Sequence, residues 1–251
     1  MVKNMNHGSI LIAGIRDVQS ILEHNPDALI EIHISSRRRD AKIKSIAGRA
    51  RKLSIPVMEQ DIDLLDKMVP GVRHQGVVAR SQPLSQPESL ESLLQNLDHP
   101  PLILVLDGVQ DPHNLGACLR SADGAGVDAL VVPADGACSI TPVVTRVAAG
   151  AAHSIPIFRV TNLRRSLEQM QKQGVWLVGT SDQAEATLWQ TDLTGPLALV
   201  MGSEGDGLRA LTQKQCDYLV QIPMQGVVES LNVSVATGVL LFEALRQRQT
   251  P

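Results

Sequence analysis

From residue 101 onward, short apolar runs alternate with amphipathic stretches. The runs consist of Val, Leu, Ile and Ala, and their length is typical of strands that are buried on both faces. The predicted strands are Leu102–Leu106, Ala129–Val132, Ile155–Val160, Val175–Gly179, Leu197–Met201 and Leu219–Ile222. The predicted helices between them are Leu115–Gly124, Pro142–Ala152, Leu163–Gln173 and Leu208–Tyr218. This order predicts an α/β fold with a mostly parallel sheet covered on both faces.

The first 80 residues predict a second, smaller α/β unit. Its predicted helices are Ile15–Leu22, Asp40–Leu53 and Ile62–Met68, and its predicted strands are Ala28–Ile34, Ile55–Met58 and Gln75–Ala79. Ser81–Pro87 is polar, rich in proline and without periodicity, which is typical of a linker, and a short helix is predicted at Glu88–Leu97 before Pro100 and Pro101. We therefore predict an N-terminal domain over 1–80, a linker over 81–100 and a C-terminal domain over 101–251.

The stretch that ends the alternation combines a strand, a small-residue loop and a long helix. Pro223 stops the last strand, Gln225–Val228 forms the loop, and Glu229–Asn232 opens the helix, with Ser230 as the expected N-cap. Such a loop presents free backbone N–H and C=O groups beside a helix N-terminus, which suits a polar ligand. A capped helix without a ligand is the alternative.

Two further polar loops follow predicted strands, at the edge of the sheet where ligands bind in open α/β folds. The first begins at Asp107 and leads into the predicted helix that carries Arg120. Arginine can bind phosphate with two hydrogen bonds, but an isolated helical arginine more commonly forms a surface ion pair. The second is GSEGDGL at residues 202–208. Its glycine spacing differs from the dinucleotide-binding fingerprint, and it lacks the G-K-[ST] of a phosphate-binding loop, so a nucleotide-dependent oxidoreductase is disfavoured.

Charge is unevenly distributed along the chain. The net charge is −3, yet eight cations with one acid among them lie close together in the N-terminal unit. They are Arg37, Arg38, Arg39, Lys42, Lys44, Arg49, Arg51 and Lys52. Such a patch can neutralise several phosphates and bind RNA in a salt-dependent way. A solvated helix face explains the same composition.

The remaining composition excludes several classes of protein. Three cysteines, Cys118, Cys138 and Cys216, are isolated, so neither a disulfide framework nor a zinc site is expected. A reduced, cytoplasmic location is the simpler interpretation. No apolar run has the length of a membrane span, and the N-terminus has no secretory pattern. We therefore expect no membrane association.

Three motifs in the C-terminal region resemble those of the SpoU, or TrmH-like, RNA ribose 2′-O-methyltransferases. They are DGVQDPHNLGACLR at 107–120, VMGSEGDG at 200–207 and IPMQGVVESLNVSVA at 222–236. Their order and separation match the family over residues 101–248. Residues 9–80, with His74-Gln75-Gly76-Val77, resemble the ribosomal-protein-like substrate-binding domain of the branch that methylates a guanosine of 23S rRNA, in the peptidyl-transferase loop that holds P-site tRNA.

The resemblance implies a fold, a cofactor and a set of site residues. The catalytic domain is expected to contain a deep trefoil knot, an exception to the rule that chains are unknotted, and to form a homodimer through this domain. S-adenosylmethionine is the implied methyl donor, with no metal. The implied cofactor-binding residues are Gly202, Gly207, Ile222, Met224 and Leu231. The implied catalytic residues are Asn114, Arg120, Glu204, Ser230 and Asn232.

Chemical roles for these residues follow from the reaction. A ribose hydroxyl is a poor nucleophile and needs proton removal or stabilisation of its developing charge. A guanidinium does not lose its proton in proteins, so we assign Arg120 to the target phosphate and the forming alkoxide. Asn114 and Asn232 would orient the ribose and the loop backbone, and Glu204 would position either loop. Two alternatives are a tRNA ribose methyltransferase and a non-catalytic RNA-binding assembly factor.

Overall fold

The computed structural model describes residues 9–38, 40–82, 87–205 and 207–249. The chain forms two compact units that divide between residues 85 and 86. Each unit has its own sheet and its own hydrophobic core. The described residues include no helix with both the length and the apolar character that a membrane crossing requires.

The N-terminal unit is a four-stranded sheet with the order β1-β4-β2-β3, in which only β2 and β3 are parallel. Its elements are β1 (Ile10–Ala13), α1 (Ile15–His24), the 3₁₀ turn η1 (Pro26–Ala28), β2 (Leu29–Ser35), α2 (Ala41–Lys52), β3 (Val57–Gln60), α3 (Ile62–Met68) and β4 (Val77–Ser81). Strand β4 shows how both faces are covered. Val77 and Ala79 join the core under α1 and α2, whereas Val78 packs with Leu65 of α3 on the opposite face.

Helix α2 presents the basic residues because its apolar positions recur with helical spacing. Ile43, Ile46, Ala47 and Ala50 are buried, so the cations between them face outward. Asp40 begins the helix by accepting a hydrogen bond from the backbone N–H of Ile43 at 3.2 Å.

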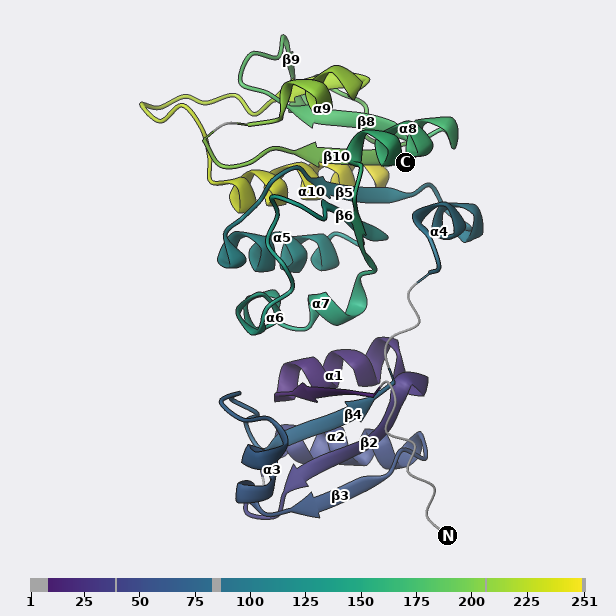
Figure 1. The fold of residues 1–251 in the computed structure, drawn as a ribbon, viewed down its shortest axis with the longest axis vertical. Helices are drawn as coiled ribbons and strands as arrows, with labels where there is room; N and C mark the ends of the chain where they lie inside the picture. The colour runs from purple at the N-terminus through teal and green to yellow at the C-terminus, as the bar shows by residue number, and fades with distance from the viewer. Residues whose placement is uncertain (1–8, 39, 83–86, 206, 250–251) are drawn as a thin grey trace. The chain divides into compact units, whose positions relative to one another are not determined.

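The C-terminal unit is a seven-stranded sheet with the order β7-β6-β5-β10-β8-β11-β9, and every neighbouring pair is parallel (Figure 1). Its strands are β5 (Leu102–Leu106), β6 (Ala129–Pro133), β7 (Ile157–Val160), β8 (Trp176–Thr180), β9 (Ala186–Thr187), β10 (Leu197–Met201) and β11 (Tyr218–Gln221). Its helices are α4 (Leu90–Asn96), α5 (Pro112–Gly124), α6 (Pro142–Ala148), α7 (Ala151–Ser154), α8 (Leu163–Lys172), the 3₁₀ turn η2 (Leu188–Gln190), α9 (Ala210–Gln215) and α10 (Val233–Gln249). The predicted parallel α/β sheet is confirmed.

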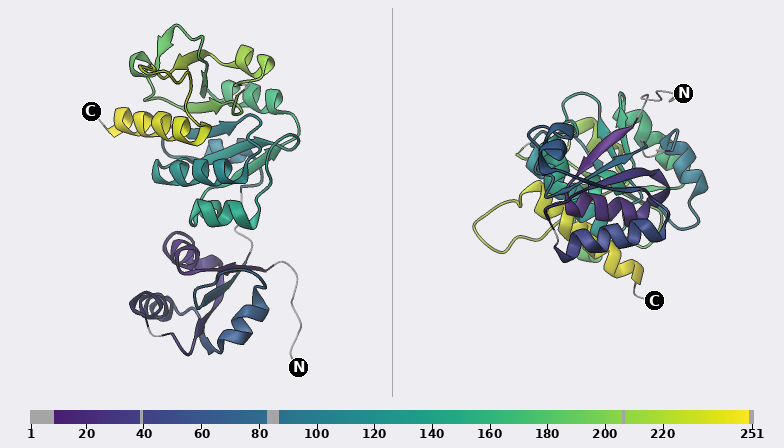
Figure 2. Two further views of the ribbon diagram at one scale, coloured as in Figure 1. Left: turned by 90° about the vertical axis from the view of Figure 1, so that its left-hand side faces the viewer. Right: turned by 90° about the horizontal axis from the view of Figure 1, so that it is seen from below.

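Alternate side chains of the central strand β5 enter two separate cores. Leu102, Leu104 and Leu106 pack with residues of α5, α6 and α10, whereas Ile103 and Val105 pack with residues of α4 and α8. Helix α10 lies alongside α5 on one face of the sheet, as the left view of Figure 2 shows. The sheet therefore holds its strand ends rigidly between two layers of helices.

Two predicted helices are wrong in extent. The helix predicted at Pro142–Ala152 is interrupted, because Ala149 and Gly150 both have positive φ angles, 55° and 105°. The helix predicted to reach Tyr218 ends at Gln215, since Tyr218 already belongs to β11.

The pattern of the sequence also missed three features. Strand β1, with its half-exposed edge residues Ile10 and Leu11, was not predicted, nor was the two-residue strand β9. Within the predicted linker, Leu90 and Leu93 of α4 pack into the core of the C-terminal unit. This part of the linker therefore belongs to the fold.

Candidate active site

Three polar side chains from three separate loops form one hydrogen-bonded cluster beyond the carboxyl ends of β5, β10 and β11. Asn114 Nδ2 donates to Glu204 Oε2 at 2.8 Å. Asn232 Nδ2 donates to Asn114 Oδ1 at 3.0 Å and to Glu204 Oε1 at 3.1 Å. We call these residues the Asn–Glu–Asn cluster. Each of the three sequence motifs contributes one member, and the carboxylate of Glu204 holds both amides.

Two helix starts position the asparagines. Asp111 caps α5 by accepting from the backbone N–H of His113 at 3.0 Å, and this bond lowers the pKa of the Asp111 carboxyl. Asn114 lies in the first turn and is only 8% exposed, so its amide needs partners. Asn232 Oδ1 accepts from the backbone N–H of Ser234 at 2.9 Å at the start of α10. Asn232, and not Ser230 as predicted, therefore occupies the capping position.

The loop that carries Glu204 is a tight glycine turn after β10. Ser203 and Gly207 exchange two backbone hydrogen bonds, at 3.0 and 3.2 Å. A Cβ on Gly202 would lie 2.0 Å from the carbonyl carbon of Gly207, which no side chain could tolerate. Gly205 and Gly207 have positive φ angles, so glycine is required on conformational grounds as well. The turn fixes where Glu204 is presented.

A cavity of about 660 Å³ adjoins the cluster. We call it the cofactor cavity, after the residues predicted to bind the cofactor. All five residues predicted to bind the cofactor line it, as do the predicted catalytic residues Glu204, Ser230 and Asn232. The cofactor-binding predictions are Gly202, Gly207, Ile222, Met224 and Leu231. Its volume lies in the range of small-molecule sites, about 300–1,000 Å³.

Part of the cofactor cavity was missed by the sequence reasoning. Thr180, the last residue of β8, and residues 181–183 after it also line the cavity. The signal was present, because this polar Thr-Ser-Asp-Gln segment follows a buried strand at the same edge of the sheet as the three motifs. Its brevity and its lack of glycine made it less conspicuous.

A second cavity, of about 410 Å³, lies against the same loop, and we call it the outer cavity. Ser203, Glu204, Gly207 and Val233 line both cavities. The outer cavity is otherwise lined by the loop after β5, by Asn114 and by Arg209. The loop with Glu204 is therefore a wall that the two cavities share.

Arg120 is not part of the cluster. It lies on the third turn of α5, exposed, and within the described structure its side chain forms no hydrogen bond or ion pair. Six residues along a helix amount to about 9 Å of rise and a turn of about 120° away from Asn114. The lining of neither cavity includes it. Its predicted catalytic role stays a prediction.

The predicted RNA-binding cations are exposed wherever the structure describes them, and Arg39 lies outside the described residues. Arg38 donates to the backbone oxygen of Gln75 at 2.7 Å, and Arg49 pairs with Glu23 at 3.2 Å. The other cations have no protein partner among the described residues. They are Arg37, Lys42, Lys44, Arg51 and Lys52.

The cysteines show no sign of nucleophilic use. Burial raises the pKa of the Cys118 thiol to about 11 and that of Cys216 to about 12, so both remain protonated at neutral pH. Among the described residues, no group of three or more His, Cys, Asp or Glu side chains could hold a metal ion. The chemistry of the site therefore centres on the cluster and on the two cavities beside it.

Family models match both units of the chain. Residues 101–242 match the SpoU rRNA Methylase family, and residues 11–87 match the RNA 2′-O ribose methyltransferase substrate binding family. The chain belongs to the SpoU rRNA methylase family. The predicted family is thus confirmed, and its three motifs are the loops that meet at the Asn–Glu–Asn cluster.

Curated relatives and solved structures extend the likeness over nearly the whole chain. The Pseudomonas putida 23S rRNA (guanosine-2′-O-)-methyltransferase RlmB is 52% identical over 95% of this chain and 96% of its own length. Its Haemophilus influenzae counterpart is 50% identical over 94% and 97%. The SpoU methyltransferase AviRb from Streptomyces viridochromogenes, solved with AdoMet, superposes with a TM-score of 0.76 at 27% identity, covering 97% of this chain and 92% of AviRb.

Proposed function

We propose that this protein transfers a methyl group from S-adenosylmethionine to the ribose 2′-oxygen of a guanosine in 23S rRNA, in the peptidyl-transferase loop. The observation that carries the proposal is the Asn–Glu–Asn cluster, because it joins one residue from each family motif beside a cavity of cofactor size. The full-length likeness to RlmB proteins supports the guanosine of 23S rRNA as the target.

The cofactor cavity suits S-adenosylmethionine. The backbone groups of Gly202 and Ile222, which directly follow β10 and β11, line the cavity and can bind the edge of an adenine. Leu208 and Leu231 supply apolar surface for the ring. Gly202 has no room for a side chain because the backbone of Gly207 packs directly against it. When bound, the sulfonium supplies the methyl group to be transferred.

The protein's part in the reaction is orientation and charge stabilisation. Glu204 fixes the amides of Asn114 and Asn232, which leaves Asn114 well placed to orient a ribose at the shared wall. Positioning of this kind can contribute roughly 7–11 kcal/mol to the barrier. Arg120 would bind the target phosphate and stabilise the forming alkoxide, and phosphate or water would take the proton. No metal is needed for these roles.

A homodimer through the C-terminal unit would explain two features of the fold. Val235 and Phe242 on α10 are 52% and 50% exposed, although they lie seven residues apart on one face of the helix. A partner that covers this face would bury apolar surface. The second feature is Arg120, which lies outside the cluster of its own chain. If two catalytic units pack together at their sites, Arg120 of one unit comes closer to a reaction centre.

A trefoil knot is supported by the order of the strands. Strand β11 pairs with β8 and β9, whereas the next element, α10, packs on α5 and contacts β10. The segment 222–232 must therefore cross back past β8 to reach α10. We propose that this crossing passes through the loop formed by the preceding residues, which would make the cofactor cavity part of the knot.

The N-terminal unit would capture the RNA through the outward face of α2. Its unpartnered cations Lys42, Lys44 and Arg51 are free to neutralise phosphates. The match of this unit to a substrate-binding family supports the same role.

Ribose-methylation mapping of rRNA from cells with and without this protein tests the proposal. We expect loss of one 2′-O-methylguanosine in 23S rRNA, restored by the wild-type chain. Loss of a methylated ribose in tRNA instead would favour the alternative target. The Aquifex aeolicus TrmH/SpoU tRNA modifying enzyme, with 32% identity and a TM-score of 0.56, covers 62% of this chain. Failure to bind S-adenosylmethionine would favour a non-catalytic RNA-binding factor.

A further inference from the structure

The outer cavity contains one arginine that no part of the proposed mechanism uses. Arg209 follows the Glu204 loop, and it is the only cation that lines the cavity among the described residues. Asp111 and Glu204 line the same cavity, so an anion could enter it only with a local positive charge. Arg209 provides that charge.

A buried carboxylate holds the guanidinium of Arg209 in place. Its Nη1 lies 3.4 Å from Asp107 Oδ1, and the Asp107 side chain is 0% exposed while that of Arg209 is 54% exposed. Neither oxygen of Asp107 has a hydrogen-bond partner among the described residues. A buried charge is costly unless it is paired, so Asp107 is expected to hold the arginine firmly.

Two glycines leave room for the same guanidinium. A Cβ on Gly108 would lie 3.3 Å from Arg209 Nη2, and one on Gly136 would lie 3.1 Å from it. Both glycines have positive φ angles. The guanidinium thus packs against the backbone at Gly108 and Gly136, and within the described structure its other N–H groups have no protein acceptor. They are available to a ligand.

We propose that the outer cavity receives the target nucleotide of the RNA, that Arg209 binds one of the two phosphates that flank this nucleotide while the other remains assigned to Arg120, and that Asp107 is the positioning residue for Arg209. The methyl group must pass between two bound molecules, and the two cavities share the wall that carries Glu204. Asn114 lines the outer cavity and Asn232 the cofactor cavity, and the two are hydrogen bonded to each other. This inference rests on the proposed methyl transfer.

Replacement of Arg209 by glutamine tests the phosphate contact. With a 23S rRNA transcript as substrate, R209Q should lower kcat/KM about 10- to 100-fold, the size expected for one charge-assisted hydrogen-bonded contact. The slope of log affinity against log salt should fall by about 0.7, since one phosphate contact to single-stranded RNA is lost. Calorimetric affinity for S-adenosylmethionine should not change. R209K should keep part of the affinity and most of the salt slope.

The matched control is R164Q, which removes the same charge from an exposed arginine paired with Glu168 on α8, and which should leave all three quantities unchanged. D107N should weaken RNA binding less than R209Q does. The double variant D107N/R209Q should bind RNA as R209Q alone does, because Asp107 acts through Arg209.

An R209Q enzyme with a lower melting temperature but the wild-type salt slope and KM would overturn the inference, since the ion pair would then be structural only. If R209Q does not fold, the same measurements on R209K decide. A wild-type chain that does not methylate 23S rRNA would refute the proposed function itself, whereas full activity of R209Q in an active wild-type background refutes only this inference.

Discussion

Asn232 Nδ2 lies 3.0 Å from Asn114 Oδ1, although the two residues are 118 positions apart in the chain. The bond joins the start of the last helix to the first helix after the central strand. Glu204 accepts from both asparagines, so the loss of either one leaves a carboxylate oxygen with fewer partners.

The two asparagines should therefore be energetically coupled. N114A and N232A should each lower both the free energy of unfolding and the rate of methyl transfer, and the double variant should deviate from additivity by about 0.5–3 kcal/mol. Urea denaturation of the four proteins measures this coupling. N96A on the exposed face of α4 is the control partner for N232A, and that pair should be additive. Additivity of N114A and N232A would mean that the cluster does not act as a unit.

Arg120 should matter for turnover and not for folding. It is exposed and has no protein partner among the described residues, so R120A should change the free energy of unfolding by less than about 0.5 kcal/mol. Methyl transfer should be lost while calorimetry still detects S-adenosylmethionine. R164A serves as the control. An active R120A enzyme would remove Arg120 from the proposed mechanism.

The outward face of α2 should dominate the affinity for RNA. Replacement of Lys42, Lys44 and Arg51 by glutamine should weaken binding of a 23S rRNA transcript and lower the salt slope by about 0.7 for each contact that is lost from a single strand. Three exposed cations of the C-terminal unit, Arg164, Lys172 and Lys214, provide the control triple variant. Equal affinity of the two triple variants would contradict the proposed capture surface.

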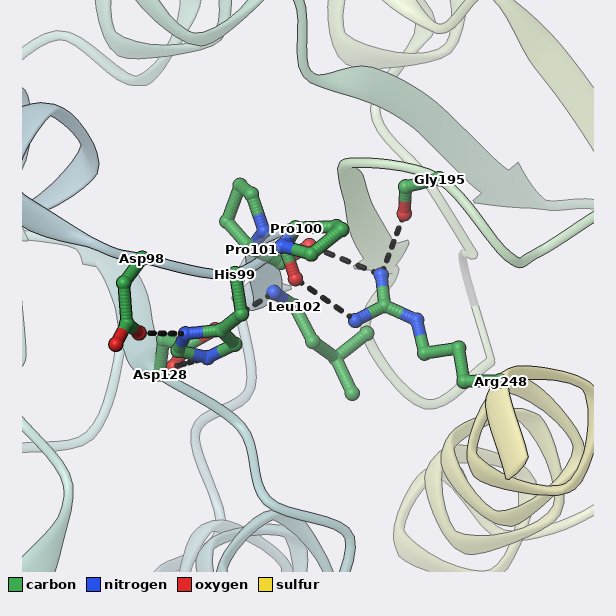
Figure 3. A network of polar contacts seen from close by, with 8 residues as sticks. All are labelled: Asp98, His99, Pro100, Pro101, Leu102, Asp128, Gly195 and Arg248. Carbon is green, nitrogen blue, oxygen red and sulfur yellow. Dashed lines mark hydrogen bonds and ion pairs between the residues drawn. The ribbon is translucent and has the colours of Figure 1, made fainter.

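His99 should make stability depend on pH near neutrality. Asp128, at 2.9 Å from Nε2, raises the pKa of His99, and a hydrogen bond with Asp98 adds to this shift (Figure 3). The folded-state pKa lies above the unfolded value of about 6.5, so the stabilisation is complete below that value and is lost as pH rises through the folded pKa.

The melting temperatures of the wild type and of H99Q, compared across a pH range from about 5 to about 9, measure this linkage. We expect the wild type to be the more stable protein at the acidic end and the two curves to converge at the alkaline end. Parallel curves would show that the histidine remains in one protonation state throughout.

Gly116 should be irreplaceable on steric grounds. A Cβ there would lie 2.6 Å from Val147 Cβ and 2.9 Å from the backbone oxygen of Val144, so G116A should push α6 away from α5 and cost about 1–3 kcal/mol in the free energy of unfolding. Gly48 in α2 meets nothing within 4 Å, and G48A should stabilise the fold by up to about 1 kcal/mol. Denaturation curves of both variants decide this contrast.

Periodicity predicted the layers of the fold because burial repeats along each element. The alternation of Leu102 and Ile103 between two cores is such a repeat. Local backbone choices were not predictable in this way. Nothing in a run of alanines shows that Ala149 adopts a positive φ angle, and β9 has only two residues, held by pairing with distant Val220 and Gln221.

The candidate site was predictable as three loops but not as a geometry. The sequence predicted Ser230 as the cap, whereas Asn232 takes that position in the structure, where Asn114 and Glu204 reach it from elsewhere in the chain. Arg209 escaped notice because its significance depends on Asp107, an acid more than a hundred positions away that only the fold brings near.

Arg248, in the last turn of α10, donates to the backbone oxygens of Pro100, Pro101 and Gly195 at 3.1, 2.9 and 2.6 Å (Figure 3). Residues 249 and 100 therefore lie near each other, and a short peptide could join them. A circular permutant with this junction, opened at the fully exposed Val227, would lack α4 but keep the other contacts of the C-terminal unit, while its new ends release any threaded segment. The activity of such a chain would show whether methyl transfer needs only the arrangement of the site residues or also the threading of the chain.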